Sequence, residues 1–288
     1  MVIVIFSLGM QAMCGIFGFA LRKPIPISKV FKILEKLEAH QYLDEAKPVG
    51  GFGAGVAVLG NDGNIILEKI GKVSGSPSSH LSKIVSVDEA AILVGHVRMP
   101  SPHFMKTARF METAQPYIAK CYGEFTIASV HNGNITNYEE IREKLGRTHV
   151  FESERVELID SEVVPHLFEE LLTKKRDVEE ALYALLCALQ GSSAIALLQV
   201  GKRKTFLHFV HKGRTRGLTI WINEHGELVF CSRREPLIEE FNNVLKEGGF
   251  KEKISIAHGE DVGLKLSYPL TFGKASSRPQ NAGKTKRV

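Results

Sequence analysis

Met13-Cys14-Gly15-Ile16-Phe17-Gly18-Phe19 is the stretch on which the interpretation of this chain depends. A cysteine that directly follows a methionine can become the first residue of the mature protein, where it carries a thiol and a free α-amino group together. An α-amino group has a pKa of ~8 in peptides, so part of it is neutral at physiological pH and accepts the thiol proton. The apolar residues that follow predict a buried strand. The stretch therefore indicates a catalytic nucleophile, Cys14, whose general base is its own amine.

The composition of the 288 residues is that of a globular protein, with 44% hydrophobic and 24% charged residues, and it allows a sizeable core. The net charge is +5, and much of the basic excess lies in residues 274–288, which contain no acidic residue. This end is interpreted as a solvated tail, because it lacks the interleaved aromatic residues of a nucleic-acid binder. We see no repeat or linker elsewhere. The sequence therefore predicts a leader at 1–13, a single domain at 14–273 and a basic tail at 274–288.

Residues 1–12 are apolar, but they lack a basic leading region and are too short to span a bilayer. Three explanations remain open: a short propeptide, a start codon assigned too far upstream, and a weak signal sequence. Translation that starts at Met13 is the simplest of them. No other stretch reaches transmembrane length, so we expect a cytoplasmic protein that does not bind membranes.

The four cysteines, Cys14, Cys121, Cys187 and Cys231, show no CxxC spacing and have no histidines at metal-ligand intervals. This pattern predicts a reducing compartment, no disulfide framework, no metal and no cofactor. Cys187 lies inside an apolar run and Cys231 ends a strand-like run, so both are expected to be buried thiols.

The predicted strands and helices do not alternate regularly. Hairpin-linked strands come first, then two or three adjacent helices after about residue 137, and then more strands and a last helix. This order predicts mostly antiparallel sheets covered by helices. The glycine-rich residues 50–55 continue into a strand, which favours a tight turn over a phosphate-binding loop. Residues 61–64, Asn-Asp-Gly-Asn, are typical of a hairpin.

Polar residues lie at the ends of three apolar segments, and each has a structural and a functional interpretation. Arg98 ends the run 92–97, either as a solvent-facing strand end or as a two-pronged donor to a carboxylate. His131-Asn132-Gly133 follows the run 125–130, either as a turn or as a pair of donors for an oxyanion. Asp160 precedes an apolar helical face, either as an N-cap or as the partner of a substrate ammonium. Taken singly, each site favours the structural interpretation.

Taken together, these blocks resemble the class II glutamine amidotransferases, a group of N-terminal-nucleophile enzymes. The similarity lies in five segments that occur in family order: Cys14-Gly15-Ile16-Phe17-Gly18, Gly95-His96-Val97-Arg98, His131-Asn132-Gly133-Asn134-Ile135-Thr136-Asn137-Tyr138, Ile159-Asp160-Ser161-Glu162-Val163 and Phe230-Cys231-Ser232. The resemblance covers about residues 14–240. It implies an α+β fold, a four-layer αββα sandwich of two mostly antiparallel sheets, as in N-terminal-nucleophile hydrolases.

The resemblance also implies a reaction and a role for each residue. Cys14 would attack the side-chain amide of L-glutamine, release ammonia and form a γ-glutamyl thioester that water hydrolyses to glutamate. Arg98 would bind the α-carboxylate of glutamine, and Asp160 its α-ammonium. Asn132 and Gly133 would supply the oxyanion hole.

Two further residues are expected to bind substrate, and two segments depart from the family pattern. His131 heads its motif, and Ser101 offers a hydroxyl in the loop after Arg98. That loop reads Met99-Pro100-Ser101, where the family usually has an aromatic residue, a small residue and Thr. Residues 40–48 also lack the usual family stretch. These departures speak against assignment to the well-known glucosamine-phosphate or purine-pathway enzymes.

About fifty residues follow Ser232, too few for an acceptor domain of ordinary size. We therefore expect a stand-alone glutaminase subunit that supplies ammonia to a separately encoded synthase, and the sequence leaves the oligomeric state open. Two alternatives stay open: a glutamine-binding or regulatory module with an unprocessed N-terminus, and another N-terminal-nucleophile amide hydrolase.

Overall fold

The structure of the protein is a computed structural model, which describes residues 14–43, 45, 47–202, 204–214, 217–257, 260 and 262–270. The leader predicted at 1–13 and the basic tail predicted at 274–288 lie outside the described residues. Among the described residues, no helix is both long enough and apolar enough to cross a bilayer.

Seven of the described strands form one sheet, in the order β11-β9-β10-β1-β4-β2-β3, and each neighbouring pair among them is antiparallel. Its strands are β1 (Gly15–Pro26), β2 (Gly53–Leu59), β3 (Ile65–Gly71), β4 (Glu89–Val97), β9 (Leu218–Ile222), β10 (Leu228–Cys231) and β11 (Lys251–Ile256). The strand that begins next to Cys14 therefore lies in the middle of this sheet, between β10 and β4.

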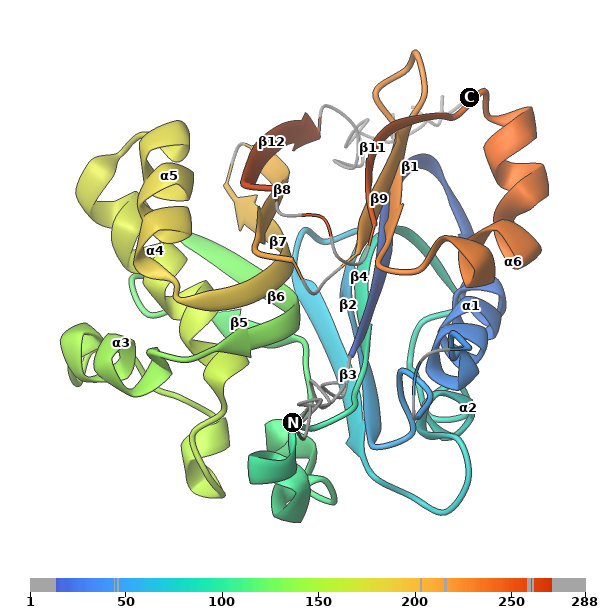
Figure 1. The fold of residues 1–288 in the computed structure, drawn as a ribbon. Coiled ribbons are helices and arrows are strands. Elements are labelled where there is room, and N and C mark those ends of the chain that lie inside the picture. The colour runs from blue at the N-terminus through green and yellow to red at the C-terminus, as the bar shows by residue number, and fades with distance from the viewer. Residues whose placement is uncertain are drawn as a thin grey trace, which may run out of the picture.

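Five strands form the second antiparallel sheet, in the order β12-β8-β7-β6-β5. They are β5 (Tyr117–Ala119), β6 (Phe125–Ile135), β7 (Gly191–Gly201), β8 (Thr205–Lys212) and β12 (Leu264–Leu270). The two sheets lie face to face, with helices on both outer sides (Figure 1).

The helices divide between the two outer faces, as Figure 1 shows. The first sheet is covered by α1 (Ile27–Ala39), α2 (Pro77–Leu81) and α6 (Arg234–Glu247). The second sheet is covered by α3 (Tyr138–Leu145), α4 (Val163–Lys175) and α5 (Val178–Ala188). The predicted four-layer αββα sandwich is therefore confirmed.

Three apolar clusters fill the spaces between the four layers. One joins the first sheet to α1 and α6, one lies between the sheets, and one joins the second sheet to α3, α4 and α5. The alternation of β1 explains its central place: Phe17 and Phe19 belong to the helix-side cluster, whereas Ile16 and Ala20 belong to the cluster between the sheets. Successive side chains of a strand point to opposite faces, so an apolar run is required for a strand buried on both sides.

Gly18 of β1 has a packing reason. A Cβ atom there would lie 2.4 Å from the backbone oxygen of Leu93 and 2.5 Å from Cε1 of Phe230. The first distance is to the neighbouring strand backbone, which cannot move away cheaply. The glycine in the opening motif therefore lets the central strands and the Phe230 ring pack together.

Several local predictions are confirmed and others are wrong. The glycine-rich residues lead into β2, and β2 and β3 form the predicted hairpin, with Gly63 at a φ of 82°. In contrast, the Asn132-Gly133 turn does not exist, because β6 continues to Ile135 and pairs with β7 along this length. Cys187 is exposed rather than buried, because it lies on the outer layer, whereas Cys231 is buried as predicted.

Candidate active site

Cys14 lies at the start of β1, where the chain enters the middle of the first sheet. Its side chain is half-buried, and its Sγ atom lies 3.3 Å from both the backbone nitrogen and the backbone oxygen of Met99. The amide of Met99 can donate to the sulfur, and the thiol can donate to the carbonyl of the same residue. The sulfur of Cys14 is therefore held next to the residue that follows Arg98.

Ser232 fixes the position of this strand end. Its backbone amide donates to the carbonyl of Ile16 at 2.9 Å, and its hydroxyl accepts from the amide of Ile16 at 3.0 Å. The serine at the end of the late strand β10 therefore ties down the strand that presents Cys14.

Arg98 is buried, with 4% of its surface exposed, and two threonines orient its guanidinium group. One terminal nitrogen donates to the hydroxyl of Thr113 at 2.6 Å, and the other donates to the hydroxyl of Thr107 at 2.8 Å. Burial lowers the pKa of Arg98, and the nearby Tyr117, Cys14 and Asp160 oppose that shift. A buried arginine whose direct hydrogen-bond partners are neutral hydroxyl groups suits the carboxylate of a ligand, because a carboxylate adds charge-assisted hydrogen bonds to the guanidinium.

Asp160 is also buried, and it does not serve as the predicted N-cap. It lies in a short 3-10 helix, Asp160–Glu162, before α4. One carboxylate oxygen accepts from the amide of Ile135 at 2.9 Å, and the other lies 3.2 Å from the hydroxyl of Ser161. The carboxylate is thus held at the end of β6, and its charge acts on Arg98.

Tyr117 is a site residue that sequence reasoning missed. Its ring is fully buried, and its hydroxyl has no hydrogen-bond partner among the described residues. Burial raises the pKa of Tyr117, as do the charges of Glu162 and Asp160, whereas Arg98 lowers it. The phenol therefore lies in the field of both charged groups of the proposed glutamine site, and a buried unpaired hydroxyl there suits a polar ligand. No motif marked it, because Tyr117 comes from the short strand β5.

His131 lies inside a network of buried polar groups. Its ring nitrogens lie 2.8 Å from the hydroxyl of Ser161 and 3.1 Å from that of Ser193. The side-chain oxygen of Gln115 accepts from the backbone amide of His131, and the side-chain nitrogen of Gln115 donates to the backbone carbonyl of His131. The same nitrogen lies 3.1 Å from Nε2 of His96. Because Ser161 is next to Asp160, the imidazole links β6 to the segment that carries the Asp160 carboxylate.

Asn132 and Gly133 lie within β6 rather than in a loop. Asn132 is 2% exposed, and its side-chain oxygen has no hydrogen-bond partner among the described residues. A Cβ atom on Gly133 would lie 2.2 Å from the backbone oxygen of Ser192 and 2.3 Å from Nε2 of His131. Only glycine fits at this position, next to the network around His131.

A cavity of about 310 Å³ opens beside Asn132 and Ser232. Its wall includes Arg233, whose guanidinium lies 4.1 Å from the centre of the Tyr42 ring and pairs with Glu45. Tyr42, from the segment 40–48 that departs from the family pattern, therefore lines this cavity. Since Ser232 also holds Ile16, the cavity lies beside the strand end that carries Cys14.

Ser101 precedes the 3-10 helix Pro102–Thr107, and its carbonyl accepts from the amide of Phe104 at 3.0 Å. That helix carries Thr107, one of the two threonines that orient Arg98.

The structure brings Cys14, Arg98 and Asp160 close enough for their charges to act on one another. Asn132 lies on the wall of the adjoining cavity.

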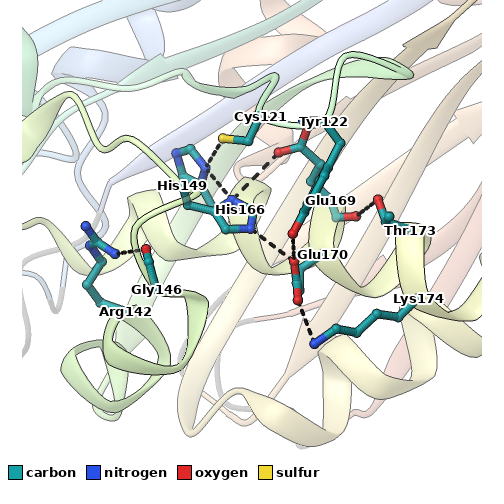
Figure 2. A network of polar contacts seen from close by, with 10 residues as sticks. All are labelled: Cys121, Tyr122, Arg142, Gly146, His149, His166, Glu169, Glu170, Thr173 and Lys174. Carbon is teal, nitrogen blue, oxygen red and sulfur yellow. Dashed lines mark hydrogen bonds and ion pairs between the residues drawn. The ribbon is translucent and has the colours of Figure 1, made fainter.

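A separate group of side chains has the composition of a metal site. Cys121, His149, His166 and Glu169 each direct one donor atom to a common point, and these atoms lie within 4.8 Å of one another (Figure 2). The sequence predicted no cysteine with histidines at metal-ligand intervals. It did not reveal this group, because the four residues come from three separate segments of the chain.

Comparisons with known proteins show which family the chain resembles. Residues 105–239 match the family model of the glutamine amidotransferase domain. The glutamine–fructose-6-phosphate aminotransferase of Sulfurisphaera tokodaii is 33% identical over 197 residues, which cover 67% of this chain and 30% of that protein. The protein of the same name from Methanothermobacter thermautotrophicus is 40% identical over 119 residues, which cover 38% of this chain and 18% of that protein. The chain thus spans about 30% of the length of the first of these relatives.

Two solved structures share the fold. The allosteric regulatory enzyme of purine biosynthesis superposes with a TM-score of 0.59 at 18% identity, over 90% of this chain and 49% of that chain. Glutamine phosphoribosylpyrophosphate amidotransferase from B. subtilis superposes with a TM-score of 0.55 at 19% identity, over 90% and 49%. At such identities the likeness establishes the fold alone.

The fold is that of the N-terminal-nucleophile hydrolases, with a half-buried cysteine at the start of the central strand. Within that class, the chain carries a class II glutamine amidotransferase domain. The departures at residues 99–101 and 40–48 do not separate it in sequence from glutamine–fructose-6-phosphate aminotransferases, because proteins of that name are among its relatives.

Proposed function

We propose that this chain hydrolyses the side-chain amide of L-glutamine to glutamate and ammonia, with Cys14 as nucleophile. The observation that carries the proposal is the position of the Cys14 sulfur, 3.3 Å from the amide of Met99 and beside the buried guanidinium of Arg98. Glutamine has an amide to attack and an α-carboxylate and α-ammonium to be held. One cation, one anion and one thiol match these three groups.

The reaction would begin when the α-amine of a mature Cys14 takes the thiol proton. The thiolate attacks the amide carbon, and the oxyanion that forms accepts hydrogen bonds from the side-chain amide of Asn132 and the backbone of Gly133. Each such donor stabilises the transition state by roughly 3–4 kcal/mol. The carbon–nitrogen bond then breaks, and ammonia leaves with the transferred proton. Water attacks the thioester, and glutamate leaves while the thiol is restored.

Arg98 and Asp160 would hold the α-carboxylate and the α-ammonium of glutamine. Both charges are buried, so both interactions form away from water, where they are stronger than at a surface. The hydroxyl of Tyr117, which has no hydrogen-bond partner among the described residues, lies in the field of both groups and would contact the bound amino acid.

The test compares three chains: one that begins at Cys14, the full chain from Met1 with its leader retained, and the Cys14→Ala variant of the first. The first should release glutamate and ammonia in equal amounts. The variant should lose on the order of 10⁴-fold in kcat, since the nucleophile and its base act as a unit. The full chain should be inactive, because the nitrogen of its Cys14 is an amide.

Intact-mass measurement of the native protein identifies which chain exists. Turnover by Cys14→Ala at the rate of the parent chain would refute the proposal. A native chain that begins at Met1 and binds glutamine without turnover would instead indicate a binding module. Preference for acyl amides over glutamine would indicate a different amide hydrolase.

We further propose that the ammonia is used by a synthase. The two relatives named above are aminotransferases of which this chain matches 30% and 18% of the length. A separately encoded synthase subunit stays a prediction. The measurement is glutamine-dependent amination with the candidate synthase added, compared with ammonia-dependent amination by that synthase alone. A glutamine-dependent rate that this chain does not raise would contradict the prediction.

A further inference from the structure

The group formed by Cys121, His149, His166 and Glu169, here called the Cys121 cluster, lies apart from the residues proposed to bind glutamine. Cys121 follows β5, His149 lies in the segment after α3, and His166 and Glu169 lie on α4. Figure 2 shows the four side chains pointing toward one another. His149, His166 and Glu169 are at most 1% exposed, and Cys121 is partly buried.

The spacing of the donor atoms fits a tetrahedral ion. With zinc–sulfur and zinc–nitrogen bonds of about 2.3 and 2.0 Å, tetrahedral angles place sulfur and nitrogen about 3.6 Å apart and two nitrogens about 3.3 Å apart. In the cluster, Sγ of Cys121 lies 3.5 Å from Nδ1 of His166, and the Nδ1 atoms of His149 and His166 lie 3.2 Å apart. The fourth donor, Oε2 of Glu169, lies 3.8 Å from Nδ1 of His149.

The surroundings of His149 set its tautomer. Its Nε2 atom lies 3.2 Å from Oε2 of Glu170, which also accepts from the hydroxyl of Tyr122, while Oε1 of Glu170 pairs with Lys174 at 2.6 Å. With Nε2 donating to this carboxylate oxygen, the lone pair of Nδ1 faces the cluster. A carboxylate behind a ligating imidazole is the usual arrangement in zinc sites.

The side chain of Glu169 also offers a donor atom to the cluster. Its Oε2 atom is buried and has no hydrogen-bond partner among the described residues, while its other oxygen accepts from the amide of Tyr122 at 3.0 Å. A proton shared by the two imidazoles would satisfy the histidines, but it would leave Oε2 of Glu169 with the Cys121 thiol, a weak donor, as its partner. One bound cation would contact all four donor atoms.

We propose that Cys121, His149, His166 and Glu169 bind one zinc ion. Thiolate, imidazole and carboxylate together suit zinc, and four protein donors in a buried setting form a closed site of the structural kind. The ion would join three segments: the end of β5, the loop before Phe151, and α4. Because α4 directly follows Asp160–Glu162, the site would hold the segment that positions the substrate-binding carboxylate.

The first experiment measures the metal content of the full chain purified without chelator or metal-affinity steps. We expect about one zinc per chain. Cys121→Ser and His166→Ala should lower that value at least about tenfold. Cys187→Ser is the matched control, because Cys187 is an exposed thiol outside the cluster, and it should retain the parent value.

The second experiment does not depend on whether the variants fold. Wild-type protein is stripped with chelator and titrated with cobalt(II), which should produce the visible absorption of a tetrahedral ion with a thiolate-to-metal charge-transfer band. Added zinc should displace the cobalt and raise the melting temperature of the stripped protein, because a ligand that binds only the folded state stabilises it. If the stripped wild-type protein takes up no zinc and its melting temperature does not change, the cluster is a metal-free hydrogen-bonded group and the proposal is wrong.

Discussion

Arg98 and Asp160 are buried charges of opposite sign, and burial of an ion is unfavourable unless its environment compensates it. The protein supplies neutral donors and acceptors to each: threonine hydroxyls around the guanidinium, and a backbone amide and a serine hydroxyl around the carboxylate. These contacts fix the orientation of the two charged groups inside the domain.

We predict that Asp160→Asn weakens glutamine binding without unfolding the protein. The substitution removes the charge that would pair with the α-ammonium, so KM for glutamine should rise about 100-fold, as expected for the loss of a buried charge-assisted hydrogen bond. The asparagine oxygen can still accept from the amide of Ile135, so the free energy of unfolding should fall by about 1 kcal/mol or less. Steady-state kinetics and urea unfolding measure the two effects. Asp62→Asn, at an exposed turn, is the control, and an unchanged KM in Asp160→Asn would contradict the assigned role.

At the scale of single elements, β6 and its neighbours organise the site. The strand carries His131, Asn132 and Gly133, and its end accepts Asp160 through the amide of Ile135. Pairing with β7 along residues 125–135 fixes which of these side chains face which layer. A change in that register would therefore displace several site residues together.

We predict that Gly133→Ala destabilises this strand and abolishes glutamine hydrolysis. The added methyl group would lie 2.2 Å from the backbone oxygen of Ser192 on the paired segment, so the backbone must shift, at about 2 kcal/mol of unfolding free energy. Urea unfolding and a glutamate assay are the measurements. Gly95→Ala is a matched control in β4, because the added Cβ atom would lie 3.3 Å from its nearest neighbour, Cδ2 of Leu34. Equal stability of the two variants would refute the steric argument.

His208 of β8 predicts a dependence of stability on pH. It is fully buried, with its ring nitrogens 2.8 Å from the side-chain oxygen of Gln199 and 3.0 Å from the hydroxyl of Ser267. Burial lowers the pKa of His208 from 6.5 to about 3. The folded state therefore excludes a proton that the unfolded chain binds below pH 6.5, so stability is present above that pH and is lost as pH falls toward 3.

The loss assigned to His208 should be about 1.4 kcal/mol per pH unit below 6.5. The measurement is urea unfolding of the wild type and of His208→Gln between pH 7.5 and 4.5 (roughly the range over which the unfolded imidazole charges). Other buried groups titrate equally in both proteins, so the difference between the two isolates His208. The wild type should lose stability faster than the variant, and parallel curves would contradict the prediction.

At the scale of the molecule, the two sheets are held together by one apolar layer to which both contribute. Phe209 of β8 and Phe230 of β10 meet edge to face across this layer, with ring centres 4.9 Å apart at 75°. Cys14 and Ser232 come from the first sheet, while Asn132 and His131 come from the second. The candidate site therefore depends on the packing between the sheets.

We predict that Phe230→Ala lowers the free energy of unfolding by about 3–5 kcal/mol, since it removes a fully buried ring at the centre of the sandwich. Because the candidate site spans both sheets, the folded variant should also turn over glutamine more slowly than the wild type. This difference is measured at a temperature below the unfolding transition of the variant. Tyr183→Ala is the control, because Tyr183 is 59% exposed and its loss should change stability by about 0.5 kcal/mol or less. A loss of less than ~1 kcal/mol in Phe230→Ala would show that the interface contributes little.

Local features of the sequence predicted mostly antiparallel sheets covered by helices, because apolar runs, hairpin signals and grouped helices can be read from the sequence alone. The resemblance of the ordered motifs to class II glutamine amidotransferases then predicted the four-layer sandwich and the protein class, and both are confirmed. The roles of Cys14, Arg98, His131 and Asp160 also come from that resemblance, and they stay predictions.

Contacts between distant segments were decided only by the tertiary structure. The path of β6 through Asn132-Gly133 depends on pairing with β7, which overrides a dipeptide that favours turns elsewhere. The exposure of Cys187 depends on which face of α5 meets the second sheet. Tyr117, the threonines around Arg98 and the Cys121 cluster carry no spacing signal, because their members are brought together by packing of separate elements. A sequence records the periodicity of each element, whereas the distance between two side chains on different elements exists only after the layers have packed.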